Sequence, residues 1–427
     1  DRTFLMHLGG KISMQSKHPI RNRDDLSMVY TPGVARVCMA IAENPEDARR
    51  LTIKRNSVAV VTDGSAVLGL GNIGPKAALP VMEGKAALFK RFADIDAWPI
   101  CLDTQDADEI VAIVKAIAPG FAGINLEDIS APRCFEIEAR LREALDIPVF
   151  HDDQHGTAIV VLAALTNALR VVGKDIADVR VVMSGAGAAG TAILKLLLAA
   201  GVRNAVVADV HGVVHAKRDD IAGEGGGEAL RWIAEHTNAE GVTGSLKEAV
   251  RGADVFIGVS APNVLAAEDV AAMADRAVVF ALANPDPEVD PSAAAETAAV
   301  VATGRSDYPN QINNVLVFPG VFRGLLDAQS RTVNTEMMLA AARALASVVS
   351  EDQLNANYIV PSVFHPEVSK VVAAAVRQAA QDSGEAPKPN GVAGAGAEEE
   401  PDGAAAEAFA AEAFEGRPVG GGGVIQR

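Results

Sequence analysis

The chain has 427 residues, which is long enough for two domains of ordinary size, each with its own core. Its formal net charge of -17 would repel nucleic acid and anionic membrane surfaces, so we expect neither as a partner. The sequence has no run of roughly 20 continuous apolar residues, no signal-peptide pattern and no disulfide framework among its cysteines. A soluble, cytoplasmic protein is therefore expected.

Apolar runs of strand length alternate with helix-period segments in the first part of the chain. The runs are SVAVVTD, AWPICLD, GINLED and IPVFHDD, which begin at Ser57, Ala97, Gly123 and Ile147. This alternation is typical of consecutive β-α-β units and predicts a parallel sheet. We assign residues 1–155 to an N-terminal domain built on this sheet.

A second series of such runs follows the helical stretch GTAIVVLAALTNALRVVG. It begins at VRVVMSG and continues through NAVVADV, ADVFIGVS and AVVFALANP, which predicts a Rossmann-like domain over residues 156–383. The segment RTVNTEMMLAAARALASVVS predicts a long C-terminal helix that packs back on the body. Residues 384–427 lack apolar periodicity and are expected to form a disordered tail. The fold class is therefore α/β.

A glycine-rich motif lies between the strand VRVVM and an apolar helix. It consists of Gly185, Ala186, Gly187, Ala188, Ala189 and Gly190. In this context the first glycine permits a tight turn, the second lets the backbone approach a pyrophosphate, and the third lets the helix lie close to the strand. The motif predicts a dinucleotide site.

The choice between NAD and NADP depends on the end of the next strand. Asp209 lies there, roughly 20 residues beyond the glycines, where a carboxylate accepts hydrogen bonds from ribose hydroxyls and repels a 2′-phosphate. NAD is therefore favoured. Lys217 and Arg218 in the following loop could pair with a 2′-phosphate, so NADP is the alternative.

Acidic residues end two strands of the first predicted sheet. GINLED ends in Glu127 and Asp128, and IPVFHDD ends in two further aspartates. Carboxylates that meet at one sheet edge raise one another's pKa unless a cation neutralises them, and an all-oxygen set selects Mg²⁺ or Mn²⁺. From spacing alone a solvated acidic rim is the alternative. His151 and His155 flank the group, where histidines either bind the metal or hydrogen-bond its ligands.

Two residues are candidates for acid and base chemistry. Tyr30 lies in the polar, proline-turned stretch MVYTPGVA, and Lys85 lies near the start of a predicted helix with otherwise apolar positions. A desolvated lysine at a helix N-terminus has a lowered pKa, so its neutral amine becomes available as a base. Taken singly, each is also compatible with a structural role, because tyrosines pack and lysines snorkel.

Long segments of the chain resemble the malic enzyme family in its shorter bacterial form. In order across roughly residues 8–380 they are YTPGVA, VTDGSAVLGLGNIG, PVMEGKAALFKRFADID, INLEDISAPRCFEIE, FHDDQHGTAIV, SGAGAAG, ANPDPEV and INNVLVFPG. The resemblance implies an enzyme that oxidises L-malate with NAD(P)⁺ and decarboxylates it to pyruvate, using Mg²⁺ or Mn²⁺. It also implies a homodimer or a higher homo-oligomer.

By matching position, the resemblance also implies roles for single residues. Lys85 matches the general base of the family and Tyr30 its general acid. The implied metal ligands are Glu127, Asp128 and Asp153, and Asp152 lies beside them as a partner that tunes Lys85.

The resemblance assigns the substrate carboxylate to two asparagines, Asn284 and Asn313, with Asn314 as a neighbour of open role. The chain departs from the family at one place. Larger members have an arginine for malate after VTDG, whereas this chain has SAV at residues 65–67. Its carboxylate clamp must therefore differ, and the backbone amides of the LGLGNIG loop are candidates.

Two other functions are compatible with these motifs. A lyase of malolactic type would keep NAD bound and release lactate, and the sequence separates this activity poorly from oxidative decarboxylation. A non-catalytic nucleotide sensor could retain the fold, but the intact Tyr30, Lys85 and carboxylates argue against it.

Overall fold

The first sheet is parallel throughout, as the sequence predicts. In this computed structural model, which describes residues 1–222 and 227–386, the strand order is β2 (Asp96–Cys101), β1 (Ser57–Thr62), β3 (Gly123–Leu126), β4 (Val149–His151). Every residue of β1, β3 and β4 is buried, which explains why these strands read as unbroken apolar runs. Because β3 and β4 are neighbours, their carboxyl ends lie side by side.

Three helices belong to this sheet: α5 (Pro75–Ala93), α6 (Ala107–Ile117) and α7 (Arg133–Ala144). The helix that the sequence predicts to begin close to Lys85 begins earlier, at Pro75. Proline suits the first turn of a helix, because its missing N–H would have no partner there. Lys85 therefore lies in the middle of α5, not near its start, which corrects the sequence-based position.

The second sheet has the strand order of a doubly wound fold. Its strands, in spatial order, are β10 (Val300–Thr303), β9 (Val278–Ala281), β8 (Val255–Gly258), β5 (Arg180–Ser184), β6 (Asn204–Asp209) and β7 (Gly212–Val213). All neighbours are parallel except β6 and β7. Strands are added on one side of β5 first and then on its other side. Ligands bind at the carboxyl edge of such a switch point. The sequence did not predict β7 or β10.

A single buried helix follows the first sheet. A π-helical turn, η5 (Asp152–Gly156), leads into α8 (Thr157–Val172). By length and composition, Asp152–Val172 is the one candidate membrane span in the described ranges, and 72% of its most apolar window is buried inside the protein. The apolar face of α8 is therefore covered by other elements, among them α9 (Ala188–Ala199) and α16 (Thr335–Ser347).

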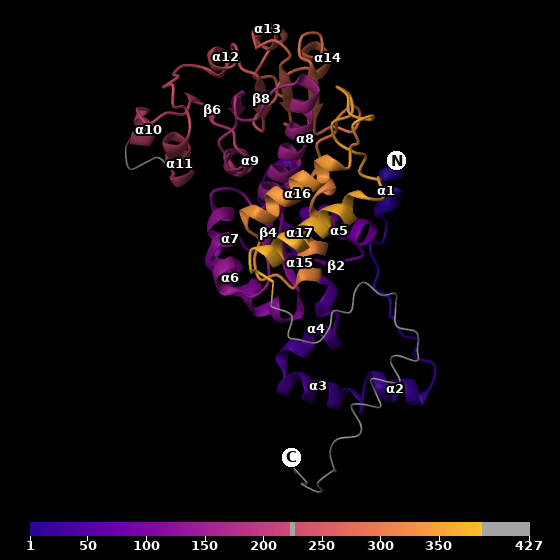
Figure 1. The fold of residues 1–427 in the computed structure, drawn as a ribbon. Coiled ribbons are helices and arrows are strands. Elements are labelled where there is room, and N and C mark those ends of the chain that lie inside the picture. The colour runs from indigo at the N-terminus through magenta and orange to yellow at the C-terminus, as the bar shows by residue number, and fades with distance from the viewer. Residues whose placement is uncertain (223–226, 387–427) are drawn as a thin grey trace. The chain divides into compact units, whose positions relative to one another are not determined.

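The C-terminal helices return to the first sheet. α15 (Phe318–Ala328) and α17 (Val368–Asp382) pack together and against α5, as Figure 1 shows. The ring of Phe89 on α5 lies 4.7 Å from that of Phe318 and 5.3 Å from that of Phe322. The predicted long helix is shorter than expected, because α16 begins after Asn334, whose side chain caps it. The sequence patterns described above do not predict α17.

The remaining elements are short. In the N-terminal segment they are α1 (Arg2–His7), α2 (Arg23–Val29), α3 (Val34–Glu43), η1 (Pro45–Asp47), α4 (Ala48–Leu51) and η2 (Ile53–Asn56). Around the two sheets they are η3 (Leu68–Leu70), η4 (Ala118–Gly120), α10 (Asp219–Ala222), α11 (Glu228–His236), α12 (Leu246–Ala249), α13 (Ala267–Ala271), α14 (Pro291–Ala294) and η6 (Asn314–Leu316). The tail expected to be disordered lies, from residue 387 on, outside the described residues.

Candidate active site

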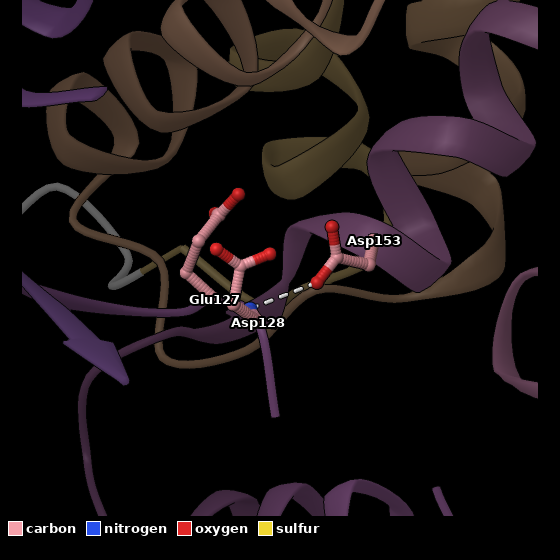
Figure 2. A group of neighbouring side chains, drawn as sticks. All are labelled: Glu127, Asp128 and Asp153. Atoms are coloured by element: carbon pink, nitrogen blue, oxygen red, sulfur yellow. Dashed lines mark hydrogen bonds between the residues drawn. The ribbon is translucent and has the colours of Figure 1, made fainter. Parts of the chain in front are cut away.

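Three carboxylates meet at the carboxyl edge of the first sheet (Figure 2). Glu127 and Asp128 follow β3, and Asp153 lies in η5 after β4; one oxygen atom of each lies within 4.8 Å of the others. The backbone N–H of Asp128 donates to Oδ2 of Asp153 at 2.9 Å. Asp128 has a φ of 53°, a left-handed conformation that aspartate tolerates better than most residues. The structure thus brings together the three residues implied as metal ligands.

This group of carboxylates fits a hard divalent cation. Glu127 and Asp128 are only 6% and 4% exposed. Burial raises the pKa of Glu127 well above its usual value; Lys85 opposes the rise, while Asp153, Asp152 and Asp128 add to it. Negative charge is therefore concentrated beyond what one lysine neutralises, and all the donors are oxygen atoms. Mg²⁺ and Mn²⁺ match both properties.

Lys85 lies beside these carboxylates. Its Nζ is 2.6 Å from Oδ2 of Asp152 and 3.0 Å from Oε1 of Glu127, and it lies 4.0 Å from the ring centroid of Phe318. The expected lowering of its pKa is wrong. Burial does lower the pKa of Lys85, but the negative charges of Asp152 and Glu127 raise it by more, so that the net shift is upward.

Asp152 is held by a residue whose role the sequence left open. Asn314 donates its side-chain amide to Oδ2 of Asp152 at 3.1 Å and to its carbonyl oxygen at 3.3 Å. The hydroxyl of Thr157 donates to Oδ1 of Asn314 at 3.1 Å, which fixes the orientation of the amide. A Cβ at Gly156 would lie 2.0 Å from Oδ1 of Asp152, so the present orientation of this carboxylate requires glycine there. Asn314 is thus a direct partner of the Asp152–Lys85 pair.

The other two asparagines have partners or neighbours elsewhere. Oδ1 of Asn313 accepts from the backbone N–H of Val315 at 2.9 Å and caps η6. Asn284 is exposed, and its carbonyl oxygen lies 2.6 Å from the position of a Cβ on Gly69. The LGLGNIG loop, the candidate clamp for the substrate carboxylate, therefore lies against Asn284.

The glycine motif has the geometry that its sequence predicts. Gly185 has a φ of 112°, and a Cβ there would lie 2.6 Å from the carbonyl oxygen of Val259. A Cβ on Gly190 would lie 2.0 Å from the carbonyl oxygen of Gly185. Gly187, by contrast, has open space around it and precedes the first turn of α9, whose N–H groups can face a pyrophosphate. η5, the turn that contains Asp153, packs against α9, so the turn and this helix are neighbours.

Asp209, at the end of β6, already has a cationic partner. Arg218 donates to both of its carboxylate oxygens, at 2.8 and 2.7 Å, and also to both oxygens of Asp220, at 2.8 and 2.6 Å. These bonds raise the pKa of Arg218 and lower that of Asp220 to about 2. Arg218 is therefore engaged by two carboxylates, while Lys217, the other candidate for a 2′-phosphate, is exposed.

Tyr30 is not brought together with Lys85. It is 67% exposed and ends α2, and neither α2 nor α3 contains a buried residue. The partners of the Lys85 amine are Asp152, Glu127 and the Phe318 ring. Within one copy of the chain, the predicted acid and base therefore lie in different surroundings.

Sequence reasoning did not single out one buried carboxylate near the site, Glu138 on α7. His155 donates from Nε2 to Oε1 of Glu138 at 2.7 Å. Burial by itself raises the pKa of Glu138, but the neighbouring His155 outweighs it and the net shift is downward. A signal was present in the sequence, because Glu138 stands among the buried positions Cys134, Ile137 and Leu141 of an amphipathic helix.

Two family models match the chain in succession. The malic enzyme N-terminal domain matches residues 9–142, and the malic enzyme NAD-binding domain matches residues 154–381. An NAD-dependent malic enzyme from Geobacillus stearothermophilus is 63% identical over 91% of this chain and 80% of its own length. A bifunctional malic/malolactic enzyme from Bacillus subtilis is 53% identical over 88% of this chain and 91% of its own.

Solved structures give the same result. An NAD-dependent malic enzyme from Thermotoga maritima superimposes with a TM-score of 0.84 at 49% identity, covering 88% of this chain and 99% of that one. The malic enzyme of Entamoeba histolytica superimposes with a TM-score of 0.87 at 40% identity, covering 91% and 82%. The predicted fold class, an α/β protein with a parallel-sheet domain and an NAD-binding domain, is confirmed. The chain belongs to the malic enzyme family.

Proposed function

We propose that this chain oxidises L-malate with NAD⁺ and decarboxylates the product to pyruvate and CO₂, with Mg²⁺ or Mn²⁺ bound. The observation that carries the proposal is the position of the Lys85 amine. It lies within hydrogen-bond distance of both Glu127, which belongs to the carboxylate group, and Asp152, which is next to Asp153. This reaction requires a base, a cation site and a dinucleotide-binding domain that lie close together.

The metal would be held by Glu127, Asp128 and Asp153, whose oxygen atoms converge. Such an ion supplies Lewis-acid polarisation of a hydroxyl or keto oxygen and stabilises developing negative charge. The amine of Lys85 is placed to accept the hydroxyl proton of malate once it has lost its own, and Asp152 is the adjacent acceptor. Asn314 keeps the Asp152 carboxylate directed at Lys85 during this transfer.

The nicotinamide, when bound, would accept the hydride from the carbon that bears this hydroxyl, and the glycine loop would orient the cofactor. Gly187 leaves the backbone open for the pyrophosphate, and η5 packs against the helix that follows it. The substrate carboxylate would be held by Asn284, Asn313 and the LGLGNIG loop. The contact between Gly69 and the Asn284 carbonyl supports this assignment, because it places two of these three elements together.

Loss of CO₂ leaves a carbon that must be protonated, and Tyr30 is the predicted acid. We propose that Tyr30 comes from a second copy of the chain in a homodimer. Most of the large hydrophobic side chains that the described part exposes lie in residues 1–53, including Phe4, Met28 and Met39. An apolar surface of this extent is typical of a protein interface. Docking α2 and α3 on a partner would cover it and carry Tyr30 to the partner's site.

The proposal includes a preference for NAD over NADP. Asp209 presents a carboxylate at the end of β6, and Arg218 is held between Asp209 and Asp220. The next residue, Val210, is 93% exposed and offers no charge to a 2′-phosphate. A 2′-phosphate would therefore meet a net negative group of side chains.

The test is a turnover assay that identifies the product. Purified protein with L-malate, Mn²⁺ and NAD⁺ should increase the absorbance at 340 nm and yield pyruvate in equal amount. Lactate without NADH would instead establish the malolactic reaction, the second candidate, which the name of the Bacillus subtilis relative favours. Omission of Mn²⁺ and addition of a chelator should abolish turnover, and initial rates with NAD⁺ should exceed those with NADP⁺.

A further inference from the structure

The turn that carries two of the implied site residues is attached to a neighbouring helix at several points. Glu138, on α7, accepts hydrogen bonds from the backbone N–H of His151 at 3.3 Å, the side-chain amide of Gln154 at 3.4 Å and Nε2 of His155 at 2.7 Å. Glu138 is 6% exposed, so its carboxylate makes its hydrogen bonds to the protein and not to solvent.

The three donors stand on either side of Asp152 and Asp153. His151 ends β4 before these aspartates, and Gln154 and His155 follow them within η5. A single buried carboxylate therefore holds both ends of the segment that presents Asp153 to the carboxylate group and Asp152 to Lys85. η5 is a π-helical turn, a rare conformation that occurs often at functional sites.

Among the residues that the structure describes, Glu138 is the acceptor that joins the side chains of Gln154 and His155 to α7. Glutamine in place of Glu138 would keep one acceptor oxygen and put an NH₂ donor in place of the other, so the three donors could not all keep their acceptor. The turn would then lose one set of the restraints that hold Asp153 beside Glu127 and Asp128, and it would depend on the 2.9 Å bond from the Asp128 N–H to Asp153 and on the bonds from Asn314 to Asp152. Groups that orient metal ligands typically change metal affinity by about 10- to 100-fold when removed.

We infer that Glu138, together with His155, is a positioning residue for the metal-binding turn Asp152–Gly156, and that it sets the affinity of the protein for the divalent cation. The inference rests on the proposed function, because that proposal makes Asp153 a metal ligand. Glu138 and His155 are not among the side chains that converge at the candidate metal site, so both act through the direction of the turn.

The experiment measures the binding of Mn²⁺ to the full chain by isothermal titration calorimetry, without malate or NAD⁺, and the binding of NAD⁺ separately. For Glu138→Gln we expect the Kd for Mn²⁺ to rise about 10-fold or more, with the Kd for NAD⁺ unchanged. The matched control is Glu136→Gln on the same helix, whose carboxylate pairs with Arg140 at the surface; it should leave both constants unchanged.

Two variants of His155 test the same inference if Glu138→Gln folds poorly. His155→Phe retains a ring but loses the donor, and it should also weaken Mn²⁺ binding. His155→Gln retains a donor and should restore part of the affinity. Near-ultraviolet circular dichroism of each variant reports whether the native packing persists.

Three outcomes would overturn the inference. An unchanged Mn²⁺ Kd in both Glu138→Gln and His155→Phe would show that the turn does not need this acceptor. Equal weakening of Mn²⁺ and NAD⁺ binding would show a general structural role. If wild type and Asp153→Asn bind Mn²⁺ equally well, the metal site itself is wrong. Wild-type protein that binds Mn²⁺ through Asp153 without oxidising malate would refute only the activity, and the Kd values would still decide the role of Glu138.

Discussion

Asn314 donates its side-chain amide to Oδ2 of Asp152 at 3.1 Å, although 162 positions separate the two residues in the chain. Asp152 follows the first sheet, and Asn314 follows the last strand of the second. The hydrogen bond therefore joins the two sheet regions at the atom that also accepts from Lys85. Catalysis by Lys85 should depend on this bond as well as on the amine itself.

Asn314→Ala should lower kcat for malate oxidation about 10- to 100-fold, because hydrogen bonds to charged groups contribute about 1.5–3 kcal/mol. The comparison is Asn313→Ala, whose side chain caps η6 and matches a substrate-binding position. That variant should raise the KM for malate more than it lowers kcat. Steady-state kinetics with both variants would contradict the assignment if their effects had the same form.

Gly156→Ala should inactivate the enzyme. The added Cβ would lie 2.0 Å from Oδ1 of Asp152, so either the carboxylate or the turn must move. We expect a loss of more than about 100-fold in kcat/KM, of the order seen when catalytic groups are misplaced by about 1 Å. Gly120→Ala is the control, since a Cβ there meets nothing within 4 Å. Full activity in Gly156→Ala would show that the turn can relax without moving Asp152.

Lys85→Ala should abolish malate oxidation, with a loss of at least about 10²- to 10⁴-fold for removal of the base. The binding of NAD⁺, measured by fluorescence titration, should remain nearly intact, because the glycine loop lies on another sheet. Lys90→Ala tests a lysine on the same helix that pairs with surface aspartates, and it should retain activity. If Lys85→Ala lost cofactor binding to the same extent as activity, the lysine would be structural.

Mixed dimers should reveal whether Tyr30 acts across subunits. Tyr30→Phe and Lys85→Ala homodimers are each expected to be inactive. When the two variants are co-expressed with different tags, a hybrid dimer has one site with both changes and one site with neither. Equal expression should therefore restore about a quarter of the wild-type activity. Hybrids isolated on both tags that remain inactive would place Tyr30 and Lys85 in the same copy.

Cys134 should resist thiol reagents in the folded protein. Burial, aided by the charges of Glu138 and Asp153, raises the pKa of this thiol to about 12. A raised thiol pKa favours the protonated form, so at pH 9 only about a thousandth of Cys134 would be the reactive thiolate. Titration with an aromatic disulfide at pH 9 should leave Cys134 unlabelled by peptide mapping until denaturant is added. Rapid labelling in the native state would contradict the buried environment.

The strands could be predicted from the sequence because buried parallel strands are continuous apolar runs. That property locates β1, β3, β5 and β8, and it places Glu127 and Asp153 at neighbouring strand ends without any knowledge of side-chain packing. The two-residue β7 is too short to be distinguished from a loop, and β10 (Val300–Thr303) was missed although three of its four residues are apolar.

Contacts between distant segments could not be predicted in the same way. The upward pKa shift of Lys85 depends on Asp152 and Glu127, which approach it only in the folded chain. Pro80 inside α5 also hid the true start of that helix, because proline in a helix interior normally breaks it. Asn313 and Asn314 are adjacent and of the same residue type. Only the path of the chain through η6 decides which of them reaches Asp152.

The return of α15 and α17 to α5 has a consequence for synthesis on the ribosome. The face of α5 that bears Phe89 is covered by Phe318 and Phe322, which are translated more than 200 residues later. The N-terminal part of the nascent chain therefore cannot bury this surface when it emerges, and the surface remains exposed until Phe318 and Phe322 have left the ribosome. Final assembly of the N-terminal sheet must wait for that segment, with a need for protection against aggregation in the interval.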